Sequence, residues 1–178
     1  MQRIAIFDMD GTLANTDSAN LAAYRAAMVR VGVRNISGLV GRVTADVVCA
    51  AMGDEAGVAL DDILRRKVET YCGELWRASM GPASEDFRCV LLNRNSFDKV
   101  VLLSDGGERR VMETLNHFGW IGLFDEIVYN GGKGDKYANY FRNFDSDPAA
   151  CVVWENEDGQ IMSAIAAGVK MENIRKVG

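Results

Sequence analysis

The sequence predicts an α/β protein in which a parallel β-sheet is flanked by helices and one helical segment is inserted after the first strand. Two observations support this fold class. From residue 99 onward, continuous apolar runs of strand length alternate with segments of helical periodicity. A separate apolar run near the N-terminus, IAIF, ends in polar residues and is followed by a long segment with only helical patterns. Continuous apolar runs are typical of parallel strands that are buried on both faces.

The first strand ends at two aspartates, within the decapeptide IAIFDMDGTL of residues 4–13. Because side chains alternate along a strand, the spacing of Asp8 and Asp10 can direct both carboxylates to the same side of the strand end. Two such carboxylates repel each other unless a cation lies between them or one is protonated. Gly11 permits the sharp turn from strand to loop, although Asp-Gly alone is also an ordinary turn sequence. The strand end is therefore a candidate reaction centre.

Helical patterns fill the next segment. Thr16–Ser18 offers capping oxygens to a first helix, and Gly32 is a suitable stop. Further helices are expected over three ranges, 44–52, 61–80 and 85–95, with a break at Gly81-Pro82. We therefore predict one domain that is formed by residues 1–14 and 83–178. Residues 15–82 are predicted to be an all-helical insertion with no strand of its own.

The rest of the chain alternates between strands and helices. Strands are expected at residues 99–104, 126–129, 150–156 and 174–177. Helices are expected at residues 107–118, 137–144 and 159–167. The polar residues that end three of the strongest strands are Asp8 and Asp10, Ser104, and Glu155 with Asn156. Because parallel strands present their carboxyl ends at one edge of the sheet, these side chains are expected to converge there.

Composition and charge argue against several classes of function. The chain of 178 residues has a net charge of −5 and no basic block, which disfavours nucleic acid as the main partner. No stretch approaches the roughly 20 apolar residues of a membrane span. Four cysteines without a CxxC pair and a single histidine, His117, argue against a zinc site or a Ser-His-Asp triad. We expect a cytoplasmic protein with reduced thiols and with its tryptophans, Trp76, Trp120 and Trp154, in the core.

The motifs and their order resemble the haloacid dehalogenase superfamily of phosphotransferases. Asp8–Thr12 matches the DxDGT motif in full, Ser104 matches a Ser or Thr at the end of an apolar strand, and a lysine precedes the last major strand. WENEDGQIMSAIAAG is similar to the family's EDSxxGxxAAxxAG motif, and GLVGRVTADV is similar to a cap stretch of the subfamily related to β-phosphoglucomutase. The resemblance implies a Rossmann-like core with the helical insertion as a small cap.

The resemblance also implies a Mg²⁺-dependent phosphatase of small phosphomonoesters, such as nucleotide or sugar phosphates. Asp8 would be the nucleophile that forms an aspartyl-phosphate, and Asp10 would protonate the leaving alcohol and then deprotonate water. The Ser104 hydroxyl and the amides that follow it would donate hydrogen bonds to the phosphoryl oxygens. The implied substrate-binding residues are Gly11, Thr12, Asp105, Gly106 and Arg42.

The phosphate-binding lysine is Lys136 or Lys133. Lys136 directly precedes a helical pattern, so a helix N-terminus would fix its direction, whereas Lys133 follows two glycines and is otherwise a solvated loop charge. The implied metal ligands are Asp8, Asp10, Glu155 and Asn156. Asn156 stands where the family carries an acid, and its amide oxygen can bind Mg²⁺ but brings no charge. We therefore expect weaker metal binding.

Asp10 favours phosphate-ester chemistry, because dehalogenases and phosphonate-cleaving relatives lack an acid at this position. A phosphatase is therefore the expected function. The alternatives are a phosphomutase of the β-phosphoglucomutase type and a degenerate, non-catalytic relative, the latter because of Asn156. The expected partner is a small phosphorylated metabolite, and the expected assembly is a monomer or a weak homodimer.

Overall fold

The computed structural model of the protein describes residues 2–33, 36, 38–53 and 56–178. The chain forms two compact units, one of residues 1–14 with 80–178 and one of residues 15–79. In the following, these are called the α/β unit and the helical unit. No helix among the described residues combines the length and the apolar character that a membrane crossing requires.

A parallel sheet forms the centre of the α/β unit. Its strands are β1 (Ile4–Phe7), β4 (Lys99–Ser104), β5 (Glu126–Tyr129), β6 (Cys151–Glu155) and β7 (Ile174–Lys176). Their order is β5-β4-β1-β6-β7, and every neighbouring pair is parallel. Phe7 at the end of β1 pairs with Leu102 in β4 and Trp154 in β6, so the carboxyl ends of these three strands lie at one edge. The predicted α/β class is confirmed.

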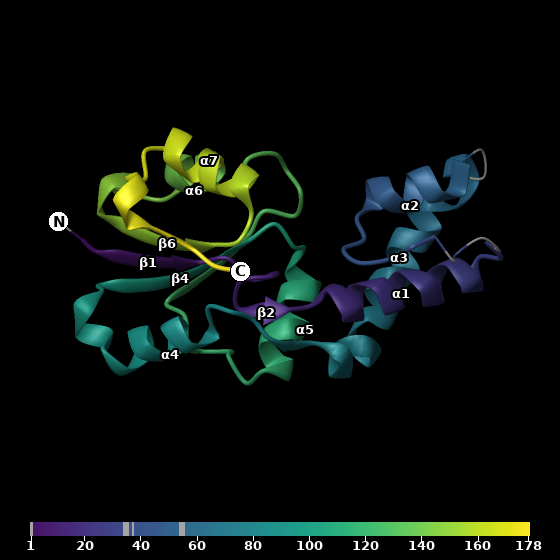
Figure 1. The fold of residues 1–178 in the computed structure, drawn as a ribbon, viewed down its shortest axis with the longest axis horizontal. Helices are drawn as coiled ribbons and strands as arrows, with labels where there is room; N and C mark the ends of the chain where they lie inside the picture. Colours follow the sequence, from purple (N-terminus) through teal and green to yellow (C-terminus); the bar gives the residue numbers. More distant parts are fainter. Residues whose placement is uncertain (1, 34–35, 37, 54–55) are drawn as a thin grey trace. The chain divides into compact units, whose positions relative to one another are not determined.

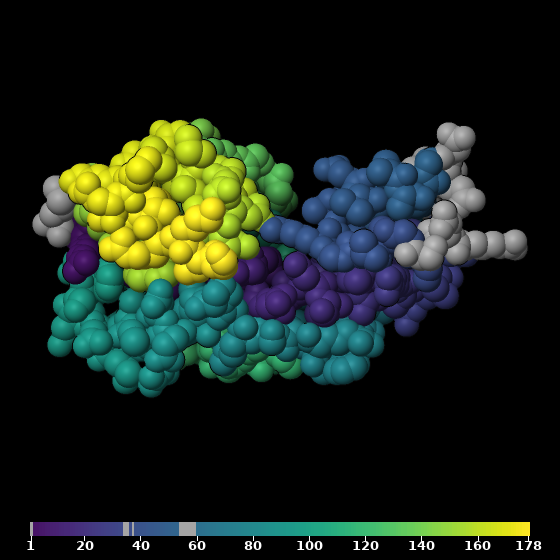
Figure 2. Space-filling view, viewed as in Figure 1, coloured from purple at the N-terminus to yellow at the C-terminus, as the bar shows by residue number. Residues whose placement is uncertain are grey.

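Helices cover both faces of this sheet (Figure 1). They are α4 (Ser84–Leu92), α5 (Glu108–His117), α6 (Lys136–Asn143) and α7 (Asp158–Ala166), with short 3₁₀ turns at Arg94–Ser96, Pro148–Ala150 and Met171–Asn173. Alternate side chains of β1 explain the two layers. Phe7 packs in one cluster with Phe87 of α4 and Leu115 of α5. Ile6 packs in the other cluster with Tyr137 of α6. In the space-filling view, the last part of the chain, including α7 (yellow), forms much of the surface of this unit that faces the reader (Figure 2).

The helical unit contains α1 (Asp17–Arg30), α2 (Ala45–Met52), α3 (Ala56–Glu74) and a 3₁₀ turn at Leu75–Arg77. An apolar cluster that includes Tyr24 and Met28 of α1, Val48 of α2 and Ile63 of α3 holds its helices together. A second cluster joins Ala19 and Ala23 to Tyr71 and Leu75. These clusters account for the apolar periodicity of residues 15–79.

Three expectations for this segment are wrong: the end of its third helix, the absence of any strand from residues 15–82, and the burial of Trp76. The third helix was expected to reach Met80, but α3 ends at Glu74 and the chain then forms the short strand β3 (Ser79–Met80), which pairs with β2 (Ala14–Asn15). The reason is a tertiary contact between residue 81 and the loop that follows β1. Gly81 N–H donates to the Leu13 carbonyl, and a Cβ at position 81 would collide with the backbone beside Leu13, so the chain must return here in extended form. Trp76 was expected in the core but is 68% exposed, with the Arg77 guanidinium over its ring.

Candidate active site

The end of β1 brings the Asp8 carboxylate against the Lys136 ammonium. Lys136 Nζ lies 2.6 Å from Asp8 Oδ1, and both side chains are buried. Lys136 is the first residue of α6, where Asp135 acts as N-cap and accepts a hydrogen bond from the Ala138 N–H. Ser163 donates to the same Asp135 oxygen, which ties the start of α6 to α7. The sequence thus fixes the direction of Lys136 through a capped helix start, as its position before a helical pattern suggested.

Glu155, at the end of β6, holds the other side of this ammonium. Its Oε2 lies 2.8 Å from Lys136 Nζ and accepts a hydrogen bond of 3.0 Å from the Tyr137 hydroxyl. Its Oε1 accepts the backbone N–H groups of Asn156, at 2.9 Å, and of Glu157, at 3.2 Å. Glu155 is only 1% exposed. Both of its oxygens are engaged in positioning Lys136 and the β6–α7 turn, and its predicted role as a metal ligand stays a prediction.

The pKa values of this buried cluster are strongly shifted. Burial raises the pKa of Asp8 to about 7, against the opposing charge of Lys136, and the charge of Glu155 adds to the rise. Burial acts to lower the pKa of Lys136, but the charges of Asp8 and Glu155 outweigh it and raise this pKa above its ordinary value. Burial, reinforced by the charge of Glu155, raises the pKa of Tyr137 well above its ordinary value. One buried ammonium therefore faces two buried carboxylates.

Asn156 meets the loop that follows β1. Thr12 Oγ1 donates a hydrogen bond of 3.2 Å to Asn156 Oδ1. Gly11 has a φ of +79°, and a Cβ at this position would collide with the Asn156 amide, so only glycine suits this turn. Gly11, Thr12 and Asn156 are thus brought together from two strand ends, as their positions predicted.

The donor set at this edge suits a hard cation rather than a soft one. Among the described residues, no three His, Cys, Asp or Glu side chains gather into a group that could hold a metal ion. What the strand ends offer is oxygen, from the buried Asp8 carboxylate and from the Asn156 amide, whose Oδ1 accepts the Thr12 hydroxyl. Mg²⁺ prefers such oxygen donors, so the residues fit this ion with less charge than an all-carboxylate site.

The turn after β4 forms the next part of the site. Ser104 is fully buried, and its Oγ accepts the Gly106 N–H at 3.0 Å. The Asp105 carboxylate is held from two sides, by Asn130 Nδ2 at 2.7 Å and by Gln160 Nε2 at 3.0 Å. These bonds fix the turn between β4 and α5, at the sheet edge where Asp8 also lies.

Asp10 has a partner that the sequence did not suggest. Its Oδ1 lies 2.5 Å from Nη2 of Arg110, in the first turn of α5, and both side chains are less than one-fifth exposed. Arg110 was missed because it follows Ser104 by six residues and belongs to an ordinary helical pattern. Tyr137 was missed for a similar reason, since aromatic residues in amphipathic helices usually belong to the core. Neither residue type carries a sequence signal for its role here.

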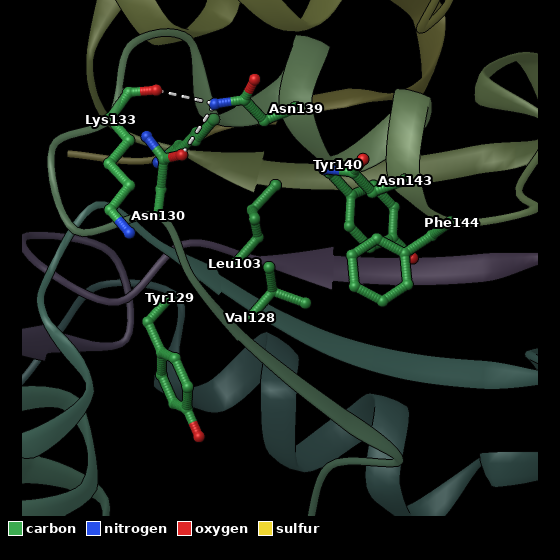
Figure 3. Close-up of a pocket in the computed structure, with 10 residues that line it drawn as sticks. Leu103, Val128, Tyr129, Asn130, Lys133, Asn139, Tyr140, Asn143 and Phe144 are labelled. Carbon is green, nitrogen blue, oxygen red and sulfur yellow. Dashed lines mark hydrogen bonds between the residues drawn. The ribbon is translucent and has the colours of Figure 1, made fainter.

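Two further predicted residues are exposed, in contrast to the buried cluster of Asp8, Lys136 and Glu155. Lys133 is exposed and lines a cavity of about 370 Å³ beside β5 and α6, which Lys136 lines as well. Figure 3 shows its backbone carbonyl accepting a hydrogen bond from Asn139, whose amide also donates to Asn130. Arg42 is exposed and belongs to the helical unit, so its predicted contact with substrate stays a prediction.

Comparison with known proteins gives consistent results. The family model of haloacid dehalogenase-like hydrolases matches residues 5–174. CbbY from Rhodobacter sphaeroides, solved in complex with phosphate, is 19% identical with a TM-score of 0.71, and the match covers 96% of this chain and 84% of CbbY. A proposed β-phosphoglucomutase from Thermotoga maritima is 22% identical with a TM-score of 0.67, covering 98% and 84%. A proposed phosphoglycolate phosphatase from Lactobacillus plantarum is 11% identical with a TM-score of 0.70, covering 95% and 84%.

At these identities the solved structures establish a shared fold, and no curated protein sequence matches the chain. The family match is the stronger finding, because it extends through both units and includes all the strand ends described above. The predicted family and the hydrolase class are thereby confirmed. The chain belongs to the haloacid dehalogenase-like hydrolases.

Proposed function

We propose that the protein is a Mg²⁺-dependent phosphatase that hydrolyses a small phosphomonoester through an aspartyl-phosphate on Asp8. The observation that carries this proposal is the buried ammonium of Lys136, 2.6 Å from Asp8 and 2.8 Å from Glu155, at the edge where Ser104 and Asp10 also lie. A fixed positive charge beside a carboxylate nucleophile is what the transfer of an anionic phosphoryl group requires.

The reaction would proceed in two steps. In the first, Asp8 Oδ2 attacks phosphorus, the bond from phosphorus to the ester oxygen breaks, and Asp10 gives its proton to the departing alkoxide. In the second, Asp10 takes a proton from water, the resulting hydroxide attacks phosphorus, and phosphate leaves as the Asp8 carboxylate is restored. Lys136 pairs with Asp8 Oδ1, which leaves Oδ2 as the attacking atom.

The phosphoryl oxygens would be held by the turn after β4. The Ser104 hydroxyl and the amides of Asp105 and Gly106 are the proposed donors, together with the Lys136 ammonium. Gly11 and Thr12 would line the opposite side, where Thr12 also orients the Asn156 amide. Asp105 would act through its backbone, because its carboxylate is engaged by Asn130 and Gln160.

Mg²⁺ would be held by the Asp8 carboxylate, the Asp10 carbonyl and Asn156, with Glu155 as a further predicted ligand. When bound, the ion supplies positive charge between the carboxylate and the phosphate, which otherwise repel each other. The chain's own residues contribute the orientation, since Thr12 donates to the Asn156 oxygen and Lys136 fixes the rotamer of Asp8.

We further propose that residues 15–79 act as a cap that selects the substrate, with Arg42 as a ligand for its phosphate or sugar. CbbY has been solved with phosphate and, as a variant, with xylulose-1,5-bisphosphate. This relative supports a sugar phosphate as the first substrate class to examine, with nucleotides as the second.

A panel of phosphomonoesters tests the proposal. Wild-type protein with Mg²⁺ should release phosphate from at least one sugar or nucleotide monophosphate, and Asp8→Asn should not. Phosphorus NMR of the products separates hydrolysis from a mutase reaction, because a mutase gives an isomeric sugar phosphate and no free phosphate. Robust turnover by Asp8→Asn would exclude the aspartyl-phosphate mechanism.

A further inference from the structure

The Arg110 guanidinium lies between two parts of the proposed site. Its Nη2 contacts Asp10 Oδ1 at 2.5 Å. Its Nη1 lies 3.3 Å from the point that a Cβ at Gly106 would occupy, and Ser104 Oγ lies 3.2 Å from the same point. The guanidinium therefore borders the turn whose amides and hydroxyl are proposed to hold the phosphoryl oxygens. Because Gly106 has no side chain, the guanidinium and the Ser104 hydroxyl can both approach this turn closely, beside Val111 Cγ2 at 3.0 Å from the same point.

From this arrangement we infer that Arg110 binds the transferring phosphoryl group directly, a role that rests on the proposed phosphatase function. A guanidinium offers five N–H donors in a rigid plane, and this fork matches two oxygens of a phosphate as well as it matches a carboxylate. Arg110 can therefore direct donors at the phosphoryl group and at Asp10 from one side chain. Its side chain is 18% exposed, so it borders solvent, from which a ligand arrives.

The charge balance of the site favours the same role. Asp8, Asp10, Glu155 and Asp105 contribute four carboxylates, whereas Lys136 contributes one ammonium that is already bound by Asp8 and Glu155. A phosphate dianion that enters beside these carboxylates requires more positive charge than Lys136 alone provides. Arg110 is a further cation at this edge, and it contacts Asp10, which Lys136 does not.

The neighbouring arginine supplies a matched control. Arg109 precedes Arg110 in the same helical turn but is 57% exposed, and its Nε lies 3.0 Å from Glu113, one turn further along α5. Adjacent residues of a helix face different directions. A substitution of Arg109 therefore removes the same charge from the same helix without touching the turn after β4.

The experiment compares wild type with Arg110→Met, Arg110→Lys and Arg109→Met. Inorganic phosphate is the probe, through its inhibition constant against a phosphomonoester and through calorimetric titration with Mg²⁺ present. Arg110→Met should weaken phosphate binding by about 10- to 100-fold, because charge-assisted hydrogen bonds are lost. Arg110→Lys should bind phosphate more tightly than Arg110→Met but less tightly than wild type. Arg109→Met should bind phosphate as tightly as wild type. Thermal unfolding confirms that each variant is folded.

Two results separate this inference from the proposed function. If Arg110→Met loses turnover but binds inorganic phosphate as tightly as wild type, Arg110 only positions Asp10, and the inference is overturned. If the wild type neither hydrolyses any phosphomonoester nor binds phosphate, the proposed function itself fails. A loss of affinity in Arg109→Met equal to that in Arg110→Met would also overturn the inference, since net charge would then explain the effect.

Discussion

The two aspartates at the end of β1 are two residues apart in the sequence but have different surroundings. Asp8 belongs to a buried cluster in which Lys136 is 2% exposed and Glu155 is 1% exposed, and every partner comes from the core of the α/β unit. Asp10 pairs with Arg110 nearer the surface, where both side chains retain some exposure. The inner cluster is enclosed by the core, whereas the outer pair keeps some access to solvent.

The largest expected effect concerns the inner aspartate. Asp8→Asn removes the nucleophile and should lower turnover by at least about 10³-fold. Asp10→Asn should lower turnover of an alkyl phosphate by about 10²- to 10⁴-fold, but much less for p-nitrophenyl phosphate, whose leaving group needs no proton. Steady-state kinetics with both esters measures this contrast. Equal losses for the two esters in Asp10→Asn would contradict the acid role.

The two cations should differ in their contribution to stability. Lys136→Met leaves two buried carboxylates without their counter-ion and should lower the free energy of unfolding by about 3–5 kcal/mol. Arg110→Met acts on a pair nearer the surface and should cost about 1 kcal/mol or less. Urea denaturation of both variants checks this order. A reversed order would mean that the buried cluster is not the rigid part of the site.

The pH dependence of stability should follow Asp8. Its pKa is raised from 3.8 to about 7, so between these values the native state binds a proton that the unfolded state releases. Stability in EDTA should therefore fall as pH rises from about 4 to 7, by up to about 1.4 kcal/mol per pH unit. Chemical denaturation at several pH values measures the slope. Asp8→Asn should flatten it, and an unchanged slope in this variant would assign the dependence to another group.

A smaller effect is expected from the hydroxyl that orients Glu155. Tyr137→Phe keeps the buried ring and removes the hydrogen bond to Glu155 Oε2, which should lower the free energy of unfolding by about 1–2 kcal/mol. Tyr140→Phe is the matched control on the same helix, because its hydroxyl makes a longer contact of 3.4 Å with Ser146. In thermal unfolding, the melting temperature of Tyr137→Phe should be lower than that of Tyr140→Phe.

The smallest effect is expected at Asn156, the uncharged residue among the predicted metal ligands. Asn156→Asp adds a charge beside the predicted Mg²⁺ ligands and should lower the Mg²⁺ concentration for half-maximal activity by up to about 10-fold. Titration of activity with Mg²⁺ measures the change. An unchanged requirement would indicate that position 156 does not contact the ion.

The convergence of the polar strand ends was predictable because parallel strands put their carboxyl ends at one edge, and this rule needs only apolar runs and their last residues. Lys136 could be favoured over Lys133 because it directly precedes a helical pattern, whereas Lys133 follows two glycines. Arg110, by contrast, is defined by a contact with Asp10, 100 residues away in the sequence, and no local pattern encodes such a contact. The same reason explains the end of α3, where pairing of β2 with β3 outweighs the helical periodicity.

The hydrogen bonds from Gly81 to Leu13 and from Ala83 to Thr12 bring the exit and the return of the chain together within the α/β unit. The intervening segment is therefore topologically an outgrowth of a single tight connection, and its removal would leave two ends that a short turn could join. Because its two ends are joined in this way, the inserted segment is one that evolution could replace by another. A graft of another helical module between residues 14 and 80 should alter which molecules are accepted while leaving the chemistry at the strand ends untouched.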